Sequence, residues 1–360
     1  MSSDLSSLEL YGWDPTWASA FSALHLPEPL FPGRVVRVDR GQCELVTAGG
    51  PLRAETRHRD DVCTGDWVAV PQSSVAAVLP RRSALIRAVA SGRSRGQVLA
   101  ANVDIVAVVV SCAAEPDLGR VERLLALAWE SGARPLVVLT KADACSDAAY
   151  VQSDVAGVAL GVDTVLTSAT TGEGLDELGA ALTGTVVLVG QSGVGKSTLA
   201  TALTGQELAV HAVRDKDGKG RHTTVRRELI PLASGAGVLI DTPGLRGAGL
   251  WDAAEGLSLA FADIDELAAG CRFDDCAHRS EPGCAVLAAI EAGALPARRL
   301  ESYRKLAREN EWAASRTDAR LRAERSNRYK IQTKAMRQLH PRPGNRRPDT
   351  GWSGSVGGWG

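Results

Sequence analysis

The sequence predicts a multidomain protein in which a small antiparallel β barrel precedes a parallel α/β domain and a helical C-terminal region. Three observations predict this order. Short β-branched stretches with glycine-containing turns fill residues 31–80, and apolar runs of strand length alternate with helix-like stretches from about residue 100. Three cysteines and a histidine then crowd into residues 271–284. With 360 residues and 44% hydrophobic side chains, the chain can bury two or three packed cores.

The N-terminal part divides into an extension, a barrel and a linker. Residues 1–30 contain turn formers and isolated aromatic residues, and no element is predicted there. Residues 31–80 include "GRVVRVDRG" and "GDWVAV", whose partial alternation is typical of a small barrel. An OB-type barrel is plausible, although an SH3-like barrel has the same periodicity. Residues 81–100 are interpreted as a linker.

The central segment has the alternation of strands and helices that is typical of a parallel α/β domain. Helix-like stretches such as "LGRVERLLALAWESG" separate the apolar runs, which favours a sheet covered on both faces. The predicted strands are "VDIVAVVVS", "PLVVLTK", "DTVLTSA", "TVVLVGQ" and "GVLIDTPG".

A phosphate-binding loop follows the strand "TVVLV". Residues 190–198, "GQSGVGKST", match G-x-x-x-x-G-K-[ST] and open a helix, a context that argues against a chance glycine-rich turn. The glycines let backbone N–H groups converge on phosphates, Lys196 would reach the β- and γ-phosphates, and Ser197 would bind Mg²⁺. The candidate nucleotide-binding residues here are Gly190, Gln191, Ser192, Gly193, Val194, Gly195, Lys196, Ser197 and Thr198.

Two further segments complete a nucleotide switch. In Asp241-Thr242-Pro243-Gly244, the aspartate would hold Mg²⁺ and the Gly244 amide would meet the γ-phosphate. Between this turn and the phosphate loop lies the polar, glycine-rich stretch 215–229, "DKDGKGRHTTVRREL". Thr223 or Thr224 would complete the Mg²⁺ shell, and the sequence leaves open which one does so.

A guanine-reading motif precedes the phosphate loop. In Thr140-Lys141-Ala142-Asp143, the aspartate can accept paired hydrogen bonds from guanine N1–H and N2–H₂, and the Lys141 stem can pack along the base. Ser168-Ala169, in "TSATTGEG", has the form of a second base-reading loop. Conventional GTPases place these motifs after the phosphate loop. Because an active site is spatial, the reversed order predicts a circularly permuted GTPase domain.

The water-positioning glutamine of Ras-like enzymes is missing, since Leu245 follows Gly244. We therefore expect slow intrinsic hydrolysis that a partner completes. His222, beside the switch threonines, is a tentative internal substitute; a structural role in the loop is an equally good interpretation.

The cluster "CRFDDCAHRSEPGC" has the spacing C-x₄-C-x-H-x₅-C. Cys271, Cys276, His278 and Cys284 form a closed set suited to structural Zn²⁺, and buried free cysteines are the alternative. The four other cysteines are scattered, which is typical of a reducing compartment.

Charge is distributed unevenly along the chain. Residues 296–347 carry 16 Lys/Arg against 5 Asp/Glu, a balance of +11, although the net charge is −1. This favours a polyanionic partner such as nucleic acid, and a solvated helix face is the alternative. No apolar run approaches a membrane span and no secretory signal is recognisable, so a cytoplasmic location without membrane contact is expected.

These motifs together resemble the circularly permuted ribosome small-subunit-dependent GTPase family (RsgA/YjeQ). The resemblance spans roughly residues 31–335 and includes "QVLAANVD", "TKAD", "GQSGVGKSTL", "GRHTT", "DTPG" and "SYRKLARE". It implies an N-terminal OB-fold β-barrel, a central circularly permuted α/β P-loop GTPase domain over 81–249 and a C-terminal α-helical zinc-binding domain over 250–340. Residues 341–360 are expected to be a disordered tail.

The resemblance also implies a function. It implies GTP hydrolysis stimulated by the small (30S) ribosomal subunit, a role in late maturation of that subunit, and contacts with its rRNA from the OB-fold barrel over 31–80 and the zinc-binding domain. A monomer is expected. Two positions depart from the family pattern: Val225 stands where a third switch threonine is usual, and Thr140 stands where asparagine is commoner, which would weaken a loop-stabilising hydrogen bond.

Three alternatives remain open at the level of sequence. A P-loop ATPase or kinase would have no use for Asp143. A nucleotide-switched RNA-binding protein with little turnover is compatible with Leu245. Another permuted ribosome-assembly GTPase would lack the C-terminal cysteine–histidine pattern.

Overall fold

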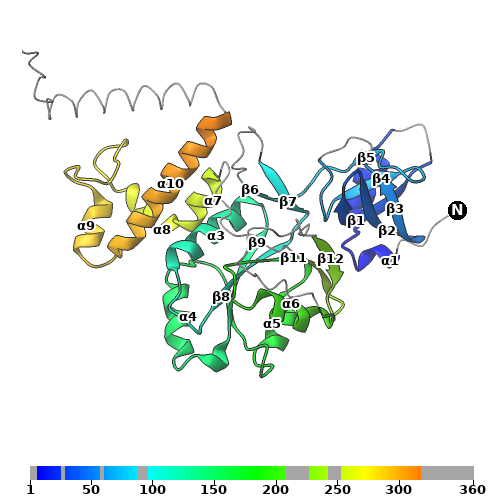
Figure 1. Cartoon of the computed structure of the whole chain (residues 1–360). Coiled ribbons are helices and arrows are strands. Elements are labelled where there is room, and N and C mark those ends of the chain that lie inside the picture. The colour runs from blue at the N-terminus through cyan, green and yellow to red at the C-terminus, as the bar shows by residue number, and fades with distance from the viewer. Residues whose placement is uncertain are drawn as a thin grey trace, which may run out of the picture. The chain divides into compact units, whose positions relative to one another are not determined.

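One sheet runs through the central domain and the N-terminal strands. The structure is a computed structural model, and it describes residues 6–25, 29–56, 61–87, 96–207, 227–241 and 253–317. The strand order is β10-β9-β8-β11-β13-β12-β1-β2-β3, with β4 paired to β1 and β5 to β4 (Figure 1). The chain divides into two compact units, residues 1–313 and 314–360, and every element described below begins in the first.

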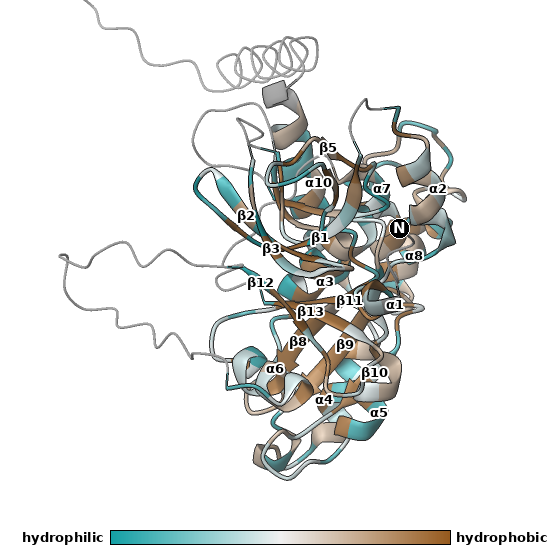
Figure 2. Ribbon diagram, turned by 90° about the vertical axis from the view of Figure 1, so that its right-hand side faces the viewer, coloured by the Kyte–Doolittle hydropathy of each residue, from teal (hydrophilic) through white to brown (hydrophobic). Residues whose placement is uncertain are grey.

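The central domain is the predicted parallel sheet covered on both faces. Its strands are buried along most of their length and are coloured as hydrophobic in Figure 2. One face packs against α3 and α4, and the other packs against α5 and α6. The parallel strands are β8 (Ile105–Ser111), β9 (Arg134–Thr140), β10 (Thr164–Leu166), β11 (Gly184–Val189) and β13 (Gly237–Asp241), and β12 (Glu228–Pro231) runs antiparallel to β13. The covering helices are α3 (Leu118–Glu130), α4 (Ala148–Ala156), α5 (Leu175–Ala181) and α6 (Lys196–Thr204).

The permuted order depends on a short connection between α5 and β11. Only Leu182 and Thr183 separate the two elements. Gly184, the first residue of β11, has φ +70°, and a Cβ there would lie 2.4 Å from Asp104 Oδ2. Glycine is therefore required at this position. Strand β11 then enters the sheet between β8, which precedes it in the chain, and β13, which follows it.

The N-terminal strands close the predicted small barrel. They are β1 (Phe31–Asp39), β2 (Gln42–Thr47), β3 (Gly50–Glu55), β4 (Trp67–Val70) and β5 (Ala77–Val78). Strand β1 pairs with both β2 and β4, and a parallel bridge between Glu55 and Ser74 links the end of β3 to the segment before β5. This circuit of five strands is the expected arrangement of an OB-type barrel. In the linker, β6 (Ala84–Arg87) and β7 (Gln97–Ala101) form a separate two-stranded sheet.

The barrel is hydrogen-bonded directly to the central sheet. Strand β1 pairs with β12 at Arg37 and Glu228. Arg34 of β1 donates a 2.9 Å hydrogen bond to Thr185 Oγ1 at the start of β11. The barrel therefore contacts both the edge of the central sheet and the strand that leads into the phosphate loop.

Two N-terminal helices were not expected from the sequence: α1 (Ser6–Glu9) and α2 (Pro15–Ser22). Trp13 and Trp17 pack against Trp67 of the barrel, with ring centroids 4.7 and 6.2 Å away. Arg82 pairs with both oxygens of Asp14 at 2.6 and 2.7 Å and lies over the Trp17 ring. The N-terminal extension is thus a packed part of the fold.

The C-terminal region docks on α3 through charged side chains. Glu122 is fully buried and accepts a 2.8 Å hydrogen bond from Arg299, which also makes two 2.8 Å bonds to Asp263. Arg123 pairs with Glu309 at 2.5 and 2.6 Å. The helices of the C-terminal region are α7 (Ala254–Ala260), α8 (Ala262–Ala268), α9 (Ala285–Glu291) and α10 (Ala297–Thr317).

The structure describes only part of the C-terminal region for which the sequence made predictions. The long basic helix expected after Pro296 is described as far as Thr317, and the expected disordered tail lies outside the described residues. Among the helices of the described residues, none has the length and apolar composition that a bilayer crossing requires.

Candidate functional site

The phosphate loop connects β11 to α6, the context that its sequence motif requires. Gly190 has φ +155°, and a Cβ there would lie 2.4 Å from the carbonyl oxygen of Val109 on β8, so only glycine fits. Lys196 Nζ donates to the carbonyl oxygens of Gly190 and Gln191 at 2.8 and 2.6 Å. The ammonium group therefore lies over the loop, where phosphate oxygens would take over these contacts.

The predicted guanine-reading loop contacts the phosphate loop. Thr140 ends β9, and its hydroxyl donates a 2.5 Å hydrogen bond to the carbonyl oxygen of Val194. Lys141 has φ +59°, and its Nζ donates to the carbonyl oxygen of Gly193 at 2.7 Å. Two loops that are more than fifty residues apart in the chain are thus joined by two hydrogen bonds.

The second base-reading loop orients the aspartate. Ser168 is fully buried, and its hydroxyl donates a 2.6 Å hydrogen bond to Asp143 Oδ1. The backbone N–H of Ala142, in the short 3-10 turn η1 (Ala142–Ala144), donates to the carbonyl oxygen of Thr167. The Asp143 carboxylate remains exposed, so the arrangement presents a fixed acceptor to a base. Ala169, the other predicted base-reading residue of this loop, follows Ser168 and is half-buried.

The predicted Mg²⁺ ligands are only partly described. Ser197 lies in the first turn of α6, and Asp241 ends β13, which runs parallel to β11. The two therefore lie at the same edge of the sheet as the phosphate loop. The predicted switch residues His222, Thr223, Thr224, Gly244 and Leu245 lie outside the described residues, as does Val225.

A cavity of about 290 Å³ adjoins the phosphate loop. Its walls include Lys141, Gln191 and Ser192, together with Asp117 and Arg120 at the start of α3. The hydrophobic floor comes from β8 and α3. Helix α3 thus borders this cavity beside the predicted nucleotide site at one end, and the C-terminal region packs along its length.

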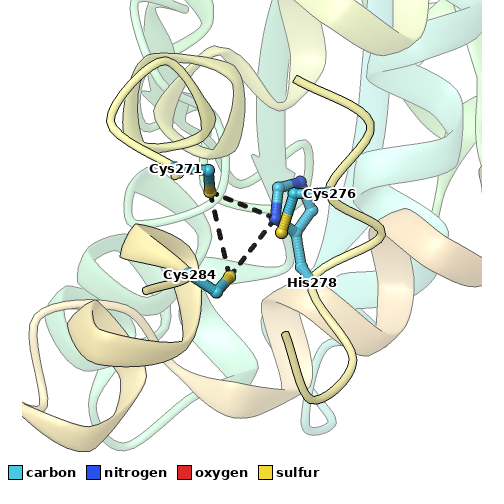
Figure 3. A group of neighbouring side chains, drawn as sticks. All are labelled: Cys271, Cys276, His278 and Cys284. Carbon is cyan, nitrogen blue, oxygen red and sulfur yellow. Dashed lines mark hydrogen bonds between the residues drawn. The ribbon is translucent and has the colours of Figure 1, made fainter. Parts of the chain in front are cut away.

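The cysteine–histidine cluster comes together as the spacing predicts (Figure 3). Nδ1 of His278 lies 3.6 Å from Cys271 Sγ and 3.5 Å from Cys284 Sγ, and these two sulfurs are 3.9 Å apart. The ligand atoms of all four residues lie within 4.8 Å of one another. In a tetrahedral Zn²⁺ site, bonds of about 2.3 Å to sulfur and 2.0 Å to nitrogen place neighbouring ligand atoms roughly 3.5–3.8 Å apart. The cluster therefore fits a metal such as zinc.

Glu281 holds the loop that carries His278. Its carboxylate accepts hydrogen bonds from the backbone N–H groups of Ala277, Arg279 and Ser280 at 3.1, 2.6 and 2.9 Å. His278 itself has φ +55°, a conformation that costs free energy outside glycine. The hydrogen bonds to Glu281 fix the peptide groups on either side of it.

The buried cysteines outside the cluster are not reactive groups. Burial raises the pKa of Cys43 to about 11, of Cys63 to about 12 and of Cys112 to about 11. Their thiols stay protonated at neutral pH, so they act as small apolar side chains.

Comparison with known proteins identifies the family. Residues 78–251 match the sequence family described as RsgA GTPase. The chain is 60% identical over 343 residues to the small ribosomal subunit biogenesis GTPase RsgA of Streptomyces coelicolor, covering 91% of this chain and 93% of that protein. This protein belongs to the RsgA GTPase family. It is a GTP hydrolase.

Further RsgA relatives and solved structures agree with this result. The relative RsgA 2 of Lactiplantibacillus plantarum is 44% identical over 77% of this chain and 82% of its own length. The crystal structure of YjeQ from Thermotoga maritima matches with a TM-score of 0.57 and 26% identity, covering 77% of this chain and 97% of that one. YloQ, described as a circularly permuted GTPase, matches with a TM-score of 0.55 and 24% identity over 78% of this chain and 95% of its own. The predicted family, the permuted fold and the GTPase activity are thus confirmed.

Sequence reasoning missed three features of this RsgA protein. The N-terminal helix α2 had a readable signal, because Asp14 followed by Pro15 is an N-cap with proline at the first helical position. The ion-pair cluster of Glu122, Arg299 and Asp263 had no sequence signal, since its members are widely separated in the chain. The burial of Arg34 had no sequence signal either, because the alternation of polar and apolar residues along a strand does not show which arginine is buried.

Proposed function

We propose that this protein hydrolyses GTP in the late maturation of the small ribosomal subunit, and that binding to this subunit stimulates its turnover. The observation that carries the proposal is the contact of Thr140 and Lys141 with Val194 and Gly193. It supports a guanine-nucleotide site rebuilt from a permuted chain. The names of the curated relatives supply the role in small-subunit biogenesis.

The proposed roles follow from the positions of the side chains. Asp143, held by Ser168, accepts hydrogen bonds from guanine, and Lys141 packs along the base. Lys196 and the loop amides bind the phosphates. Ser197 and Asp241 hold Mg²⁺, which when bound neutralises charge on the β- and γ-phosphates.

The remaining proposed roles, in binding Mg²⁺ and the γ-phosphate and in positioning water, belong to the switch residues. Thr223 or Thr224 is the third side-chain ligand of Mg²⁺, and the Gly244 amide contacts the γ-phosphate. Leu245 cannot orient water, so slow intrinsic hydrolysis is expected until the ribosomal subunit completes the site. His222 is the internal candidate for positioning water.

The metal cluster and the basic C-terminal segment are assigned to binding. Cys271, Cys276, His278 and Cys284 hold one structural Zn²⁺, which stabilises a segment with little core of its own. The +11 segment over residues 296–347 would contact rRNA phosphates, so the affinity should fall steeply with salt. A monomeric, cytoplasmic protein is part of the same proposal.

The test is GTP turnover by the pure protein, alone and with purified small subunits. Large subunits serve as the control for nonspecific stimulation. The proposal predicts strong stimulation by small subunits alone. GTP binding without any stimulation by small subunits would point instead to a nucleotide-switched binding protein.

A further inference from the structure

Arg34 is a buried arginine that forms no ion pair with any residue in the described part of the chain. It lies on β1 with 1% of its surface exposed, and its guanidinium stacks over Trp67 at 5.0 Å. Among the described residues, no carboxylate forms an ion pair with it, and its hydrogen bonds go to neutral oxygens. The carboxylates of Asp104 and Asp66 attract the guanidinium only from a distance. A buried charge without a directly bonded counter-ion is costly, so such a group calls for a physical explanation.

The donors of Arg34 are mostly unused. A guanidinium carries five N–H donors. Nη2 donates to Thr185 Oγ1 at 2.9 Å and more weakly to the carbonyl oxygen of Asn102 at 3.4 Å. Nε is sealed from solvent, and no described residue accepts a hydrogen bond from it. Nη1 has no hydrogen-bond partner among the described residues and is not sealed in this way, so it is the group that remains available.

A cavity of about 480 Å³ lies against this guanidinium. Its walls come from the N-terminal extension (Trp13 and Trp17), the barrel (Arg34), the permutation join (Thr183 and Thr185) and the residues just before β6 and just after β7 (82–83 and 102–104). The join begins β11, whereas the phosphate loop follows the other end of that strand. The cavity is therefore separate from the nucleotide site.

The other charges on the wall restrict what the cavity can bind. Arg82 is neutralised by Asp14 in a two-bond ion pair. Asp104 accepts a 2.7 Å hydrogen bond from the backbone N–H of Thr185 and leaves a second oxygen for a donor. A fully charged polyanion would be repelled by Asp104. A small oxyanion that also carries a hydrogen-bond donor satisfies both Arg34 and Asp104.

We propose that this cavity is a binding site for a small oxyanion bearing an O–H or N–H group, with Arg34 as its anchoring cation. Hydrogen phosphate and a hydroxycarboxylate such as glycolate both have this chemistry. The neutral acceptors around Arg34 keep the guanidinium in place, and the anion supplies a directly bonded counter-charge. The burial of Arg34 against the base of β11 is explained by this ligand.

The test is calorimetric titration of the full chain with inorganic phosphate, and separately with glycolate, at constant ionic strength. Saturating GDP and Mg²⁺ keep the phosphate loop occupied. We expect one equivalent of at least one anion to bind to the wild type. Arg34→Met, which keeps the length and removes the charge, should weaken that binding at least tenfold. Arg53→Met, at an exposed position on the same barrel, should leave it unchanged.

Folding of the variant is checked in anion-free buffer. Because Arg34→Met removes a buried charge that has no directly bonded counter-ion, its melting temperature there should equal or exceed that of the wild type. Added phosphate or glycolate should then raise the melting temperature of the wild type only. Failure of both anions to bind the wild type, or equal binding by Arg34→Met, would overturn the proposal. The anion that binds identifies the source as a phosphate or a carboxylate.

Discussion

The hydroxyl of Thr140 donates a 2.5 Å hydrogen bond to the carbonyl oxygen of Val194, across 54 positions of the chain and across the permutation join. Threonine thus makes a direct link between the base-reading loop and the phosphate loop, at a position where the family more often has asparagine. The sequence led us to expect a weakened contact here. The structure shows that a short hydroxyl reaches the carbonyl.

Thr140→Val should weaken GTP binding about tenfold, because a carbonyl left without its donor costs ~1–3 kcal/mol. Thr140→Asn should bind nearly as well as the wild type. Thr164→Val is the matched control, since the buried Thr164 hydroxyl on β10 has no hydrogen-bond partner within the described ranges and its loss should not reduce stability. Nucleotide affinity is measured by fluorescence titration. Unchanged affinity in Thr140→Val would show that the contact does not position the loops.

Glu281→Ala should release the metal faster than the wild type, since three backbone N–H groups around His278 lose their acceptor. Metal release to a chromogenic chelator measures this directly. Glu281→Gln, which keeps one acceptor oxygen, should give an intermediate rate. Glu291→Gln on the exposed side of α9 is the control and should match the wild type. Equal release rates for all four proteins would remove any role of Glu281 in holding the loop.

Arg299→Met should lower the free energy of unfolding by up to about 3–5 kcal/mol, because buried Glu122 keeps only a 3.1 Å bond from the partly exposed Arg298 and Asp263 loses both of its bonds. Urea denaturation followed by circular dichroism provides the measurement. Arg308→Met, at an exposed position on the same helix, should change stability by less than about 0.5 kcal/mol. Similar destabilisation by the two changes would argue against a specific ion-pair cluster.

The Asp14–Arg82 ion pair predicts a pH dependence of the N-terminal helix. Hydrogen bonding to Arg82 lowers the pKa of Asp14 from 3.8 to about 2. Because the folded pKa is the lower one, the pair stabilises the fold fully above pH 3.8, and this contribution is lost as the pH falls toward 2. The effect should be small, since both side chains are partly exposed.

The measurement compares unfolding of the wild type and Asp14→Asn, followed by tryptophan fluorescence, between pH 5 and pH 2. The difference in stability between the two proteins should shrink as the pH falls. A difference that is constant over this range would mean that the N-cap bond to Trp17, rather than the charge, accounts for the contribution of Asp14.

The local motifs were readable because their residues are contiguous or nearly so. The phosphate loop around Lys196 and the zinc-type spacing from Cys271 to Cys284 are properties of short segments, and flanking strands and helices give them context. Contacts between distant segments have no such signal. The bond from Thr140 to Val194 and the ion pair of Glu122 with Arg299 depend on how the sheet and α3 bring remote residues together.

The barrel could be predicted from the sequence only in part. Its strands were predictable from partial alternation, but the sequence could not distinguish an OB-type from an SH3-like barrel. The closure of the barrel depends on the bridge between Glu55 and Ser74, which is a single pair of residues. Its attachment depends on Arg37 facing Glu228 in β12. Neither pairing leaves a pattern in the local sequence.

The central claim is that the permuted chain rebuilds a site in which Asp143 reads guanine. The most direct measurement is competition of GTP and xanthosine triphosphate for the wild type and for Asp143→Asn. Guanine offers N–H donors to a carboxylate, whereas xanthine offers a carbonyl oxygen that the asparagine amide can bind. We predict that Asp143→Asn loses about 100-fold in GTP affinity and gains preference for xanthosine triphosphate, since a polar contact of this kind contributes ~1–3 kcal/mol. If Asp143→Asn still bound GTP as tightly as the wild type, Asp143 would not be the guanine-reading residue and the account of the site would be wrong.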